Sequence, residues 1–116
     1  MKFLCLAYGD ETDWKALSKQ EQDQLLAQDQ VVRSKGALMG AVKTDVATVR
    51  AWDGDAKVTE GPLANSGLPL AGFSIIEAKD IDEVVHLVAG TPCARANGAI
   101  EIRPILMMNS GWQSGS

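Results

Sequence analysis

Apolar residues fall into short runs separated by more polar segments. The first run, residues 2–8, is apolar at almost every position, which is typical of a central strand covered on both faces. Five further runs are rich in apolar residues and bounded by turn-forming residues, and they predict strands at 37–42, 46–52, 57–59, 70–77 and 99–106. Asp53-Gly54 lies between two of these runs and predicts a tight hairpin turn. Pro104 predicts an edge or bulge position in the last strand, because it lacks a ladder donor.

Two helices are predicted between the strands. The first begins after Ser18, which forms a capping box with Glu21, and it ends at Gly36. The second begins after Asp80 in a similar arrangement. Its apolar residues recur at i, i+3, i+4 and i+7 and predict one buried face: Ile81, Val84, Val85 and Val88.

The element order is strand, helix, strand, hairpin, strand, helix, strand. Two right-handed β-α-β units in one sheet, with both helices on one face, predict a ferredoxin-like α+β sandwich with an added hairpin. The strands carry apolar residues on both faces, but two helices cover only one face. We therefore expect a second copy to cover the other face, giving a homodimer that forms a dimeric α/β barrel.

The length and charge of the chain narrow the function classes. Its 116 residues predict one domain over 1–108, and the Gly/Ser-rich end at 109–116 predicts a flexible C-terminal tail in which Trp112 could dock. There are 11 basic and 15 acidic residues, for a formal net charge of −4, and no basic cluster, which argues against nucleic-acid binding. No apolar run is long enough for a membrane span or a secretory signal, so we expect a cytoplasmic protein without membrane partners.

Cofactor and metal motifs are missing. Two cysteines, Cys5 and Cys93, do not make a disulfide framework. No Gly-rich phosphate loop and no paired Cys or His motif is present, so we expect neither a cofactor nor a metal site. The only histidine, His86, is predicted to face solvent on the second helix. It therefore offers no base for nucleophilic catalysis.

Polar residues near strand ends supply the candidate site. Asp10 follows the first strand and either caps its own loop or stands with Tyr8 at the mouth of a cleft. Glu60 begins a stiff Gly-Pro turn, and it either belongs to that turn or lines the same cleft as Asp10.

The strands add two further candidates. Trp52 shares a strand face with Arg50. Arg103 either pairs with Glu77 across strands or faces a dimer cavity and holds an anionic ligand. The candidate ligand-binding residues are therefore Tyr8, Asp10, Trp52, Glu60 and Arg103.

Several segments together resemble the YCII-related family, in the branch named for an Asp-Gly-Pro-Phe motif. The resemblance covers residues 2–106 and is carried by Tyr8-Gly9-Asp10-Glu11, Glu60-Gly61-Pro62-Leu63-Ala64, 70–73, 76–83, Thr91-Pro92 and Glu101-Ile102-Arg103-Pro104. It implies a ferredoxin-like unit that dimerises into a dimeric α/β barrel, with an activity that is largely unassigned. Some relatives lie beside, or are fused to, extracytoplasmic-function sigma factors, which implies a regulatory link.

The chain departs from the family pattern in two places. The named motif is Glu60-Gly61-Pro62-Leu63 here, and the acidic and Lys-Glu positions that follow it in relatives are Asn65, Gly67 and Leu68. Relatives with a proposed catalytic His–Asp pair carry the His soon after the first strand, where this chain has none. No catalytic residue is therefore assigned from the resemblance.

The sequence thus predicts a small cytoplasmic homodimer that binds a small molecule or acts as an accessory regulatory module. An enzyme is the less favoured hypothesis. It would be a cofactor-free dimeric α/β barrel that performs proton transfer or lyase-type chemistry on a small aromatic or anionic substrate. A third hypothesis is a protein that interacts with a sigma factor.

Overall fold

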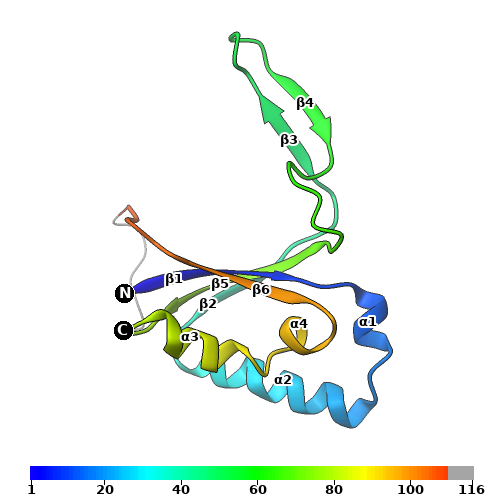
Figure 1. Cartoon of the computed structure of the whole chain (residues 1–116), viewed down its shortest axis with the longest axis vertical. Helices are drawn as coiled ribbons and strands as arrows, with labels where there is room; N and C mark the ends of the chain where they lie inside the picture. Colours follow the sequence, from blue (N-terminus) through cyan, green and yellow to red (C-terminus); the bar gives the residue numbers. More distant parts are fainter. Residues whose placement is uncertain (110–116) are drawn as a thin grey trace.

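A four-stranded antiparallel sheet with helices on one face forms the body of the protein, in a computed structural model that describes residues 1–109 (Figure 1). Along the chain the elements are β1 (Lys2–Tyr8), α1 (Glu11–Lys15), α2 (Lys19–Ser34), β2 (Leu38–Ala41), β3 (Ala47–Arg50), β4 (Lys57–Glu60), β5 (Leu70–Glu77), α3 (Ile81–Val88), α4 (Pro92–Arg95) and β6 (Ala99–Pro104). The sheet order is β2-β5-β1-β6, while β3 and β4 pair only with each other. The predicted mixed α+β class is confirmed, and Pro104 ends an edge strand as predicted.

The core lies between the sheet and the helices. In β1 and β5 every second side chain faces the helices, and Phe3 pairs with Ile76 in the register of the two strands. Two turns of α3 and one position of α2 cover them. The buried cluster consists of Phe3, Cys5, Val32, Ile76, Ala78, Val84 and Val88.

Local capping explains where the longest helix begins. The Glu21 N–H donates to Ser18 Oγ (3.1 Å) and the Ser18 N–H donates to Glu21 Oε1 (3.0 Å), so the predicted capping box is confirmed. The backbone hydrogen bond from Ser18 to the Glu21 carboxylate lowers the pKa of Glu21, because it stabilises the charged form.

The cap of α3 and its buried face agree with the sequence in part. The Asp80 carboxylate accepts from the Glu83 N–H (2.9 Å) and starts the helix. Val84 and Val88 are buried as expected, but Ile81 and Val85 are exposed. The helix therefore presents a narrower row of side chains to the sheet than its apolar stripe suggests.

The other face of the sheet is largely apolar in its middle, and no helix of residues 1–109 covers it. Leu6 lies opposite Phe73, and Ile75 lies between Leu4 and Leu38 in the strand registers. The Phe73 ring also covers Gly40, where a Cβ atom would come within 2.6 Å of it. We call this surface the open face, and its apolar members are Leu4, Leu6, Leu38, Phe73 and Ile75.

The hairpin of β3 and β4, residues 47–60, projects away from the body on the side of the open face (Figure 1). We call it the arm. Its strands pair in the predicted way, with Val49 opposite Val58, and both side chains are exposed. The arm makes the molecule elongated, with a radius of gyration of 16.0 Å, against about 13 Å for a compact chain of this length.

The two short helices, α1 and α4, were not predicted. They have 5 and 4 residues, too few to show a helical period. The predicted tail begins at residue 109, and Trp112 lies outside the described residues. The division at residue 108 therefore stays a prediction. Among the residues described, no helix is long and apolar enough to cross a membrane.

Gly98 allows a close backbone crossing beside α4. A Cβ atom there would overlap the carbonyl oxygens of both Tyr8 and Cys93. We expect Gly98→Ala to lower the free energy of unfolding by about 2–3 kcal/mol, because rigid backbone must move. In Gly90→Ala, the matched control, the new methyl group meets only the flexible Gln28 side chain. Urea denaturation measures both, and equal losses would contradict this account.

Candidate functional site

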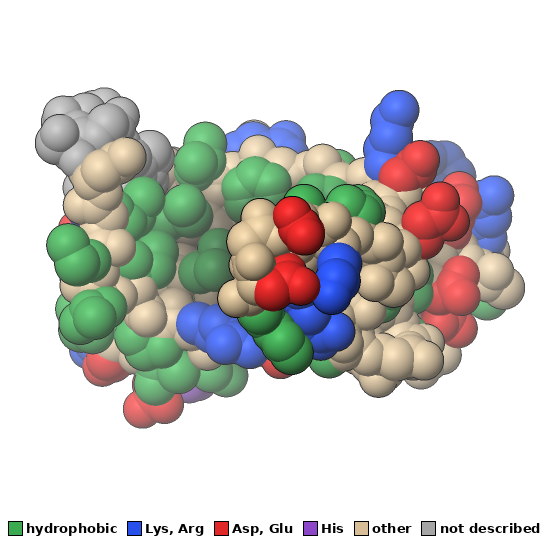
Figure 2. All heavy atoms as spheres, turned by 90° about the horizontal axis from the view of Figure 1, so that it is seen from above, with side chains coloured by type: hydrophobic (Ala, Val, Ile, Leu, Met, Phe, Trp, Pro, Cys, Tyr) green, Lys and Arg blue, Asp and Glu red, His purple; other side chains and the backbone are tan. Residues whose placement is uncertain are grey.

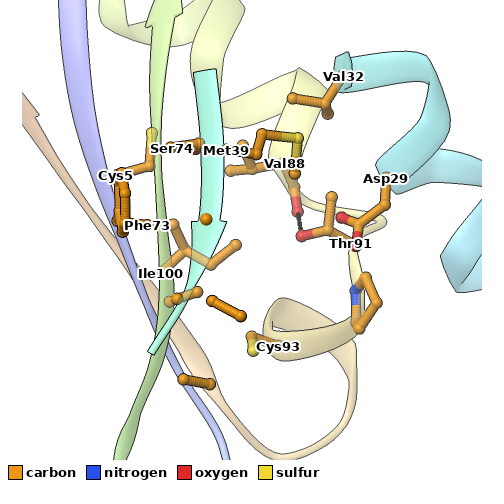
Figure 3. A pocket seen from close by; sticks show the side chains of 16 residues that line it. Cys5, Asp29, Val32, Met39, Phe73, Ser74, Val88, Thr91, Cys93 and Ile100 are labelled. Atoms are coloured by element: carbon orange, nitrogen blue, oxygen red, sulfur yellow. Dashed lines mark hydrogen bonds between the residues drawn. The ribbon is translucent and has the colours of Figure 1, made fainter. Parts of the chain in front are cut away.

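A cavity of about 190 Å³ lies on the helix side of the sheet, between β2, β5 and the segment that joins α3 to α4 (Figure 3). We call it the inner hollow. Small residues of the sheet line this space, namely Ala7, Gly40, Ala41, Ala71 and Gly72. Gly72 is small for a packing reason, since a Cβ atom there would lie 2.6 Å from the carbonyl oxygen of Gly40. Close strand packing thus creates room for a ligand.

Three polar side chains line the helix side of the inner hollow. Asp29 of α2 points toward Thr91 at the start of α4, and Cys93 lies further along the same segment (Figure 3). The Thr91 hydroxyl donates to the Val88 carbonyl oxygen (2.6 Å), so its oxygen keeps its capacity to accept hydrogen bonds. Within residues 1–109, no hydrogen bond or ion pair holds the Asp29 carboxylate.

Burial sets the electrostatics of this group. It raises the pKa of the Asp29 carboxyl, and the smaller effect of Arg33, one turn further along α2, lowers it. Burial and the neighbouring Asp29 both raise the pKa of Cys93, so its thiol stays protonated at neutral pH. Because burial disfavours the unpaired charge of Asp29, either a bound proton or a positively charged ligand group in the hollow would lower the energy of this side chain.

A second cavity of about 420 Å³ adjoins the first. We call it the outer hollow, and both hollows are lined by Ala71, Pro92 and Cys93. Asp10, Glu11 and Trp14 line it on the side of α1. The Asp10 carboxylate caps α1 by accepting from the Thr12 N–H (2.9 Å), whereas Tyr8 does not line this hollow, so a cleft shared by Asp10 and Tyr8 stays a prediction.

Tyr8 and Arg103 lie on the open face, and Glu101 joins them. The Tyr8 hydroxyl donates to Glu101 Oε1 (3.1 Å), and an Arg103 nitrogen lies 3.7 Å from the same oxygen. Desolvation, followed by the hydrogen bond to Glu101, raises the pKa of Tyr8. The predicted pairing of Arg103 with Glu77 is wrong, because β1 lies between β5 and β6 and places Lys2 opposite Glu77.

The remaining two candidate residues belong to the arm. Trp52 is 90% exposed, with the Arg50 guanidinium 5.4 Å from its ring centroid. Glu60 is exposed in β4, opposite Ala47. One chain therefore does not gather the five predicted residues into one cleft. They divide among the open face, the outer hollow and the arm, and their role in binding a ligand stays a prediction.

Sequence reasoning missed Asp29 because it lies in a polar, Gln-rich helix. A signal was present, since Leu25, Asp29 and Val32 follow the spacing i, i+4, i+7 and share one helix face. A carboxylate on the face that carries the buried Val32 marks a polar group beside the core. Cys93 and Thr91 had no such signal.

His86 lies apart from both hollows. It is exposed on α3, as predicted, and its Nδ1 donates to the Asp82 carbonyl oxygen (2.8 Å). Among residues 1–109, no three His, Cys, Asp or Glu side chains are grouped so as to hold a metal ion.

The fold and the hollows define a class of small α+β proteins, in which one antiparallel sheet carries helices on one face and a pocket between the two layers. Residues 1–109 match the family described as the YCII-related domain, and the chain belongs to that family.

Two known proteins show how far the similarity reaches. The chain is 28% identical over 120 residues to an uncharacterized protein of Rhizobium meliloti (strain 1021), covering 96% of this chain and 97% of the relative. It also resembles the structure of a 5-chloro-2-hydroxyhydroquinone dehydrochlorinase from Burkholderia phenoliruptrix AC1100 in complex with 2,5-dihydroxybenzoquinone. The TM-score is 0.51 at 20% identity, covering 90% of this chain and 93% of the other. At that identity the likeness concerns the fold.

Proposed function

We propose that this protein binds a small organic molecule in the inner hollow. The observation that carries the proposal is the unpaired, half-buried Asp29 carboxylate that lines an otherwise largely apolar cavity. Binding sites are usually preformed, mostly apolar pockets with a few polar groups that orient the ligand. The hydroxyl of Thr91 and the thiol of Cys93 complete that set.

A point change in the hollow tests this function. Ala41 lines the hollow from β2, and Ala41→Leu would fill part of it. We expect this variant to lower the affinity for benzyl alcohol, a small neutral probe, at least tenfold in an NMR titration. Ala27→Leu is the matched control, because Ala27 is exposed on α2 and does not line the hollow. Equal affinity of the two variants would place the binding site elsewhere and refute the proposal.

We also propose that the protein acts as a homodimer with a ferredoxin-like protomer, closed into a dimeric α/β barrel through the open face. The strand order and the helix-free apolar surface support this assembly. Figure 2, which looks at the molecule from the side of the arm, shows hydrophobic side chains gathered beside the arm. The charged residues of the open face balance one another and would not repel a second copy: Lys2, Glu77, Glu101 and Arg103.

The arm supports the same partner. An isolated two-stranded hairpin is marginally stable in water, so the arm needs a surface to lie on. It stands on the same side as the open face (Figure 1), where a two-fold related copy would meet it. We propose that each arm packs against the other protomer and brings Trp52 to it.

A cofactor-free enzyme is the second candidate function. One observation favours it, namely that a carboxyl group with a raised pKa, Asp29, faces a cavity and could exchange a proton with a substrate. Lyase-type chemistry on a small aromatic or anionic substrate stays within this proposal. Release of chloride from a small panel of chlorinated hydroxyhydroquinones would favour the enzyme, whereas binding without turnover would favour the ligand-binding function.

Three finer predictions remain part of the proposal. The Asp-Gly-Pro-Phe branch of the family rests on Glu60-Gly61-Pro62-Leu63. A cytoplasmic location fits two free cysteines, Cys5 and Cys93. A role as an accessory regulatory module, with a sigma factor as partner, rests on the family resemblance.

A further inference from the structure

We infer that the ligand of the inner hollow is a small organic cation, with a compact apolar body and a primary ammonium head that binds Asp29. This inference rests on the proposed function of the hollow and adds the chemical class of the ligand. It follows from the charges, the hydrogen-bond acceptors and the size of the site.

The charged groups that line the two hollows are all acidic. Of residues 1–109, Asp29 is the only charged one that lines the inner hollow, and Asp10 and Glu11 are the only ones that line the outer hollow, with Glu11 paired to Lys15 (3.2 Å). Arg33 acts on Asp29 from the same helix but lines neither cavity. Since cavity walls of one sign concentrate ions of the opposite sign, the path from the outer to the inner hollow favours cations over anions.

The polar groups of the inner hollow suit an ammonium group. An ammonium carries three N–H donors and no acceptor. The Asp29 carboxylate supplies acceptors together with the counter-charge, and the Thr91 oxygen accepts beside it, because its own proton is donated to Val88. A hydrogen bond between charged groups at a partly desolvated site is roughly twice as strong as a neutral one.

The rest of the cavity suits an apolar body of limited size. Apolar side chains from the sheet and α3 face the ligand space, among them Met39, Val88 and Ile100 (Figure 3). A volume of about 190 Å³ holds roughly six groups of the size of a liquid water molecule, which take about 30 Å³ each. A single aromatic ring with an aminomethyl group is an occupant of that scale.

Three probes of similar shape and different charge test the inference. They are benzylamine, which is protonated at pH 7, benzyl alcohol, which is neutral, and benzoate, which is an anion. We expect benzylamine to bind at least tenfold more tightly than benzyl alcohol, and benzoate to bind more weakly than either. Amide shifts at Thr91, Cys93 and Ala71 in an NMR titration report binding at this site.

Asp29→Asn keeps the shape of the side chain and removes its charge. We expect it to bring benzylamine and benzyl alcohol to within about twofold of each other. Asp23→Asn is the matched control, because Asp23 lies on the same helix but is exposed and pairs with Lys19 (3.6 Å). The control should keep the full preference for the amine.

A pH titration of the unmodified protein provides a second measurement. Burial raises the pKa of Asp29, so its carboxylate gains a proton at a higher pH than an exposed aspartate. We expect the affinity for benzylamine to fall toward that of benzyl alcohol as the pH is lowered through this pKa. The affinity for benzyl alcohol itself should change little.

The possible outcomes distinguish a failure of the cation inference from a failure of the proposed ligand-binding function. If benzyl alcohol binds in the hollow as tightly as benzylamine, or if Asp29→Asn keeps the preference for the amine, the cation inference is wrong and the ligand-binding function stands. If none of the three probes shifts the amides around the hollow, both are refuted.

Discussion

Leu6→Glu is expected to convert the proposed dimer into monomers. Leu6 lies in the middle of the open face, between Phe73 of β5 and Glu101 of β6 in the strand registers. In a face-to-face dimer the new carboxylate would be buried opposite Glu101, which already pairs with Arg103, so it would lack a cation of its own, and two-fold symmetry would bury it twice. An uncompensated buried charge costs about 3–5 kcal/mol. With two copies per dimer the loss is about 6–10 kcal/mol, which weakens the dimer by about four to seven orders of magnitude.

Light scattering coupled to size-exclusion chromatography, at micromolar protein concentration, measures this change. Val85→Glu is the matched control, because Val85 is exposed on α3, in the layer that the proposed dimer leaves outside. The control should remain dimeric. If the unmodified protein is monomeric, or if the Leu6→Glu variant remains dimeric, the proposed dimeric barrel is wrong. The inner hollow would be unaffected, since one chain supplies all its lining residues.

Trp52→Ala is expected to weaken the same dimer without unfolding the protomer. The Trp52 side chain is 90% exposed and its ring contacts Arg50 of the arm, so its loss opens no cavity in the body. A tryptophan that anchors an interface contributes about 2 kcal/mol or more. With two arms per dimer, we expect a loss of about 4 kcal/mol, which is about a thousandfold in the dissociation constant.

Analytical ultracentrifugation over a dilution series gives the dissociation constant, and thermal unfolding monitored in parallel checks the protomer. Val85→Ala removes an exposed apolar side chain from the helix layer and should leave the dissociation constant unchanged. If Trp52→Ala also leaves it unchanged, the arm does not rest on the second copy and serves another partner.

Local chemistry explains why much of the fold was predictable. The strands β1 and β5 were recognisable because they are apolar at consecutive positions. The capping box of Ser18 and Glu21 depends on residues three apart and needs no tertiary contact. The hairpin between β3 and β4 follows from its turn residues in the same way.

The candidate site was predicted less well because it depends on distance in space. Tyr8 and Arg103 were placed in one group, and a shared contact with Glu101 does bring them together. Glu60 and Trp52 lie in the arm, away from that group, because an alternating strand pattern does not reveal what the hairpin packs against. Asp29 was not predicted, since a carboxylate in a polar helix differs from its polar neighbours only in how far it is buried.

By itself the sequence determined the identity of the main strands and helices, the mixed α+β class, the surplus of apolar strand surface and the family resemblance. These properties are carried by neighbouring residues and by spacing along one element. Only the tertiary structure decided that the arm stands clear of the body, that the sheet order separates Glu77 from Arg103, and that Asp29, Thr91 and Cys93 share a cavity. Those outcomes depend on which elements pack together, and cavities form where small residues from distant segments meet.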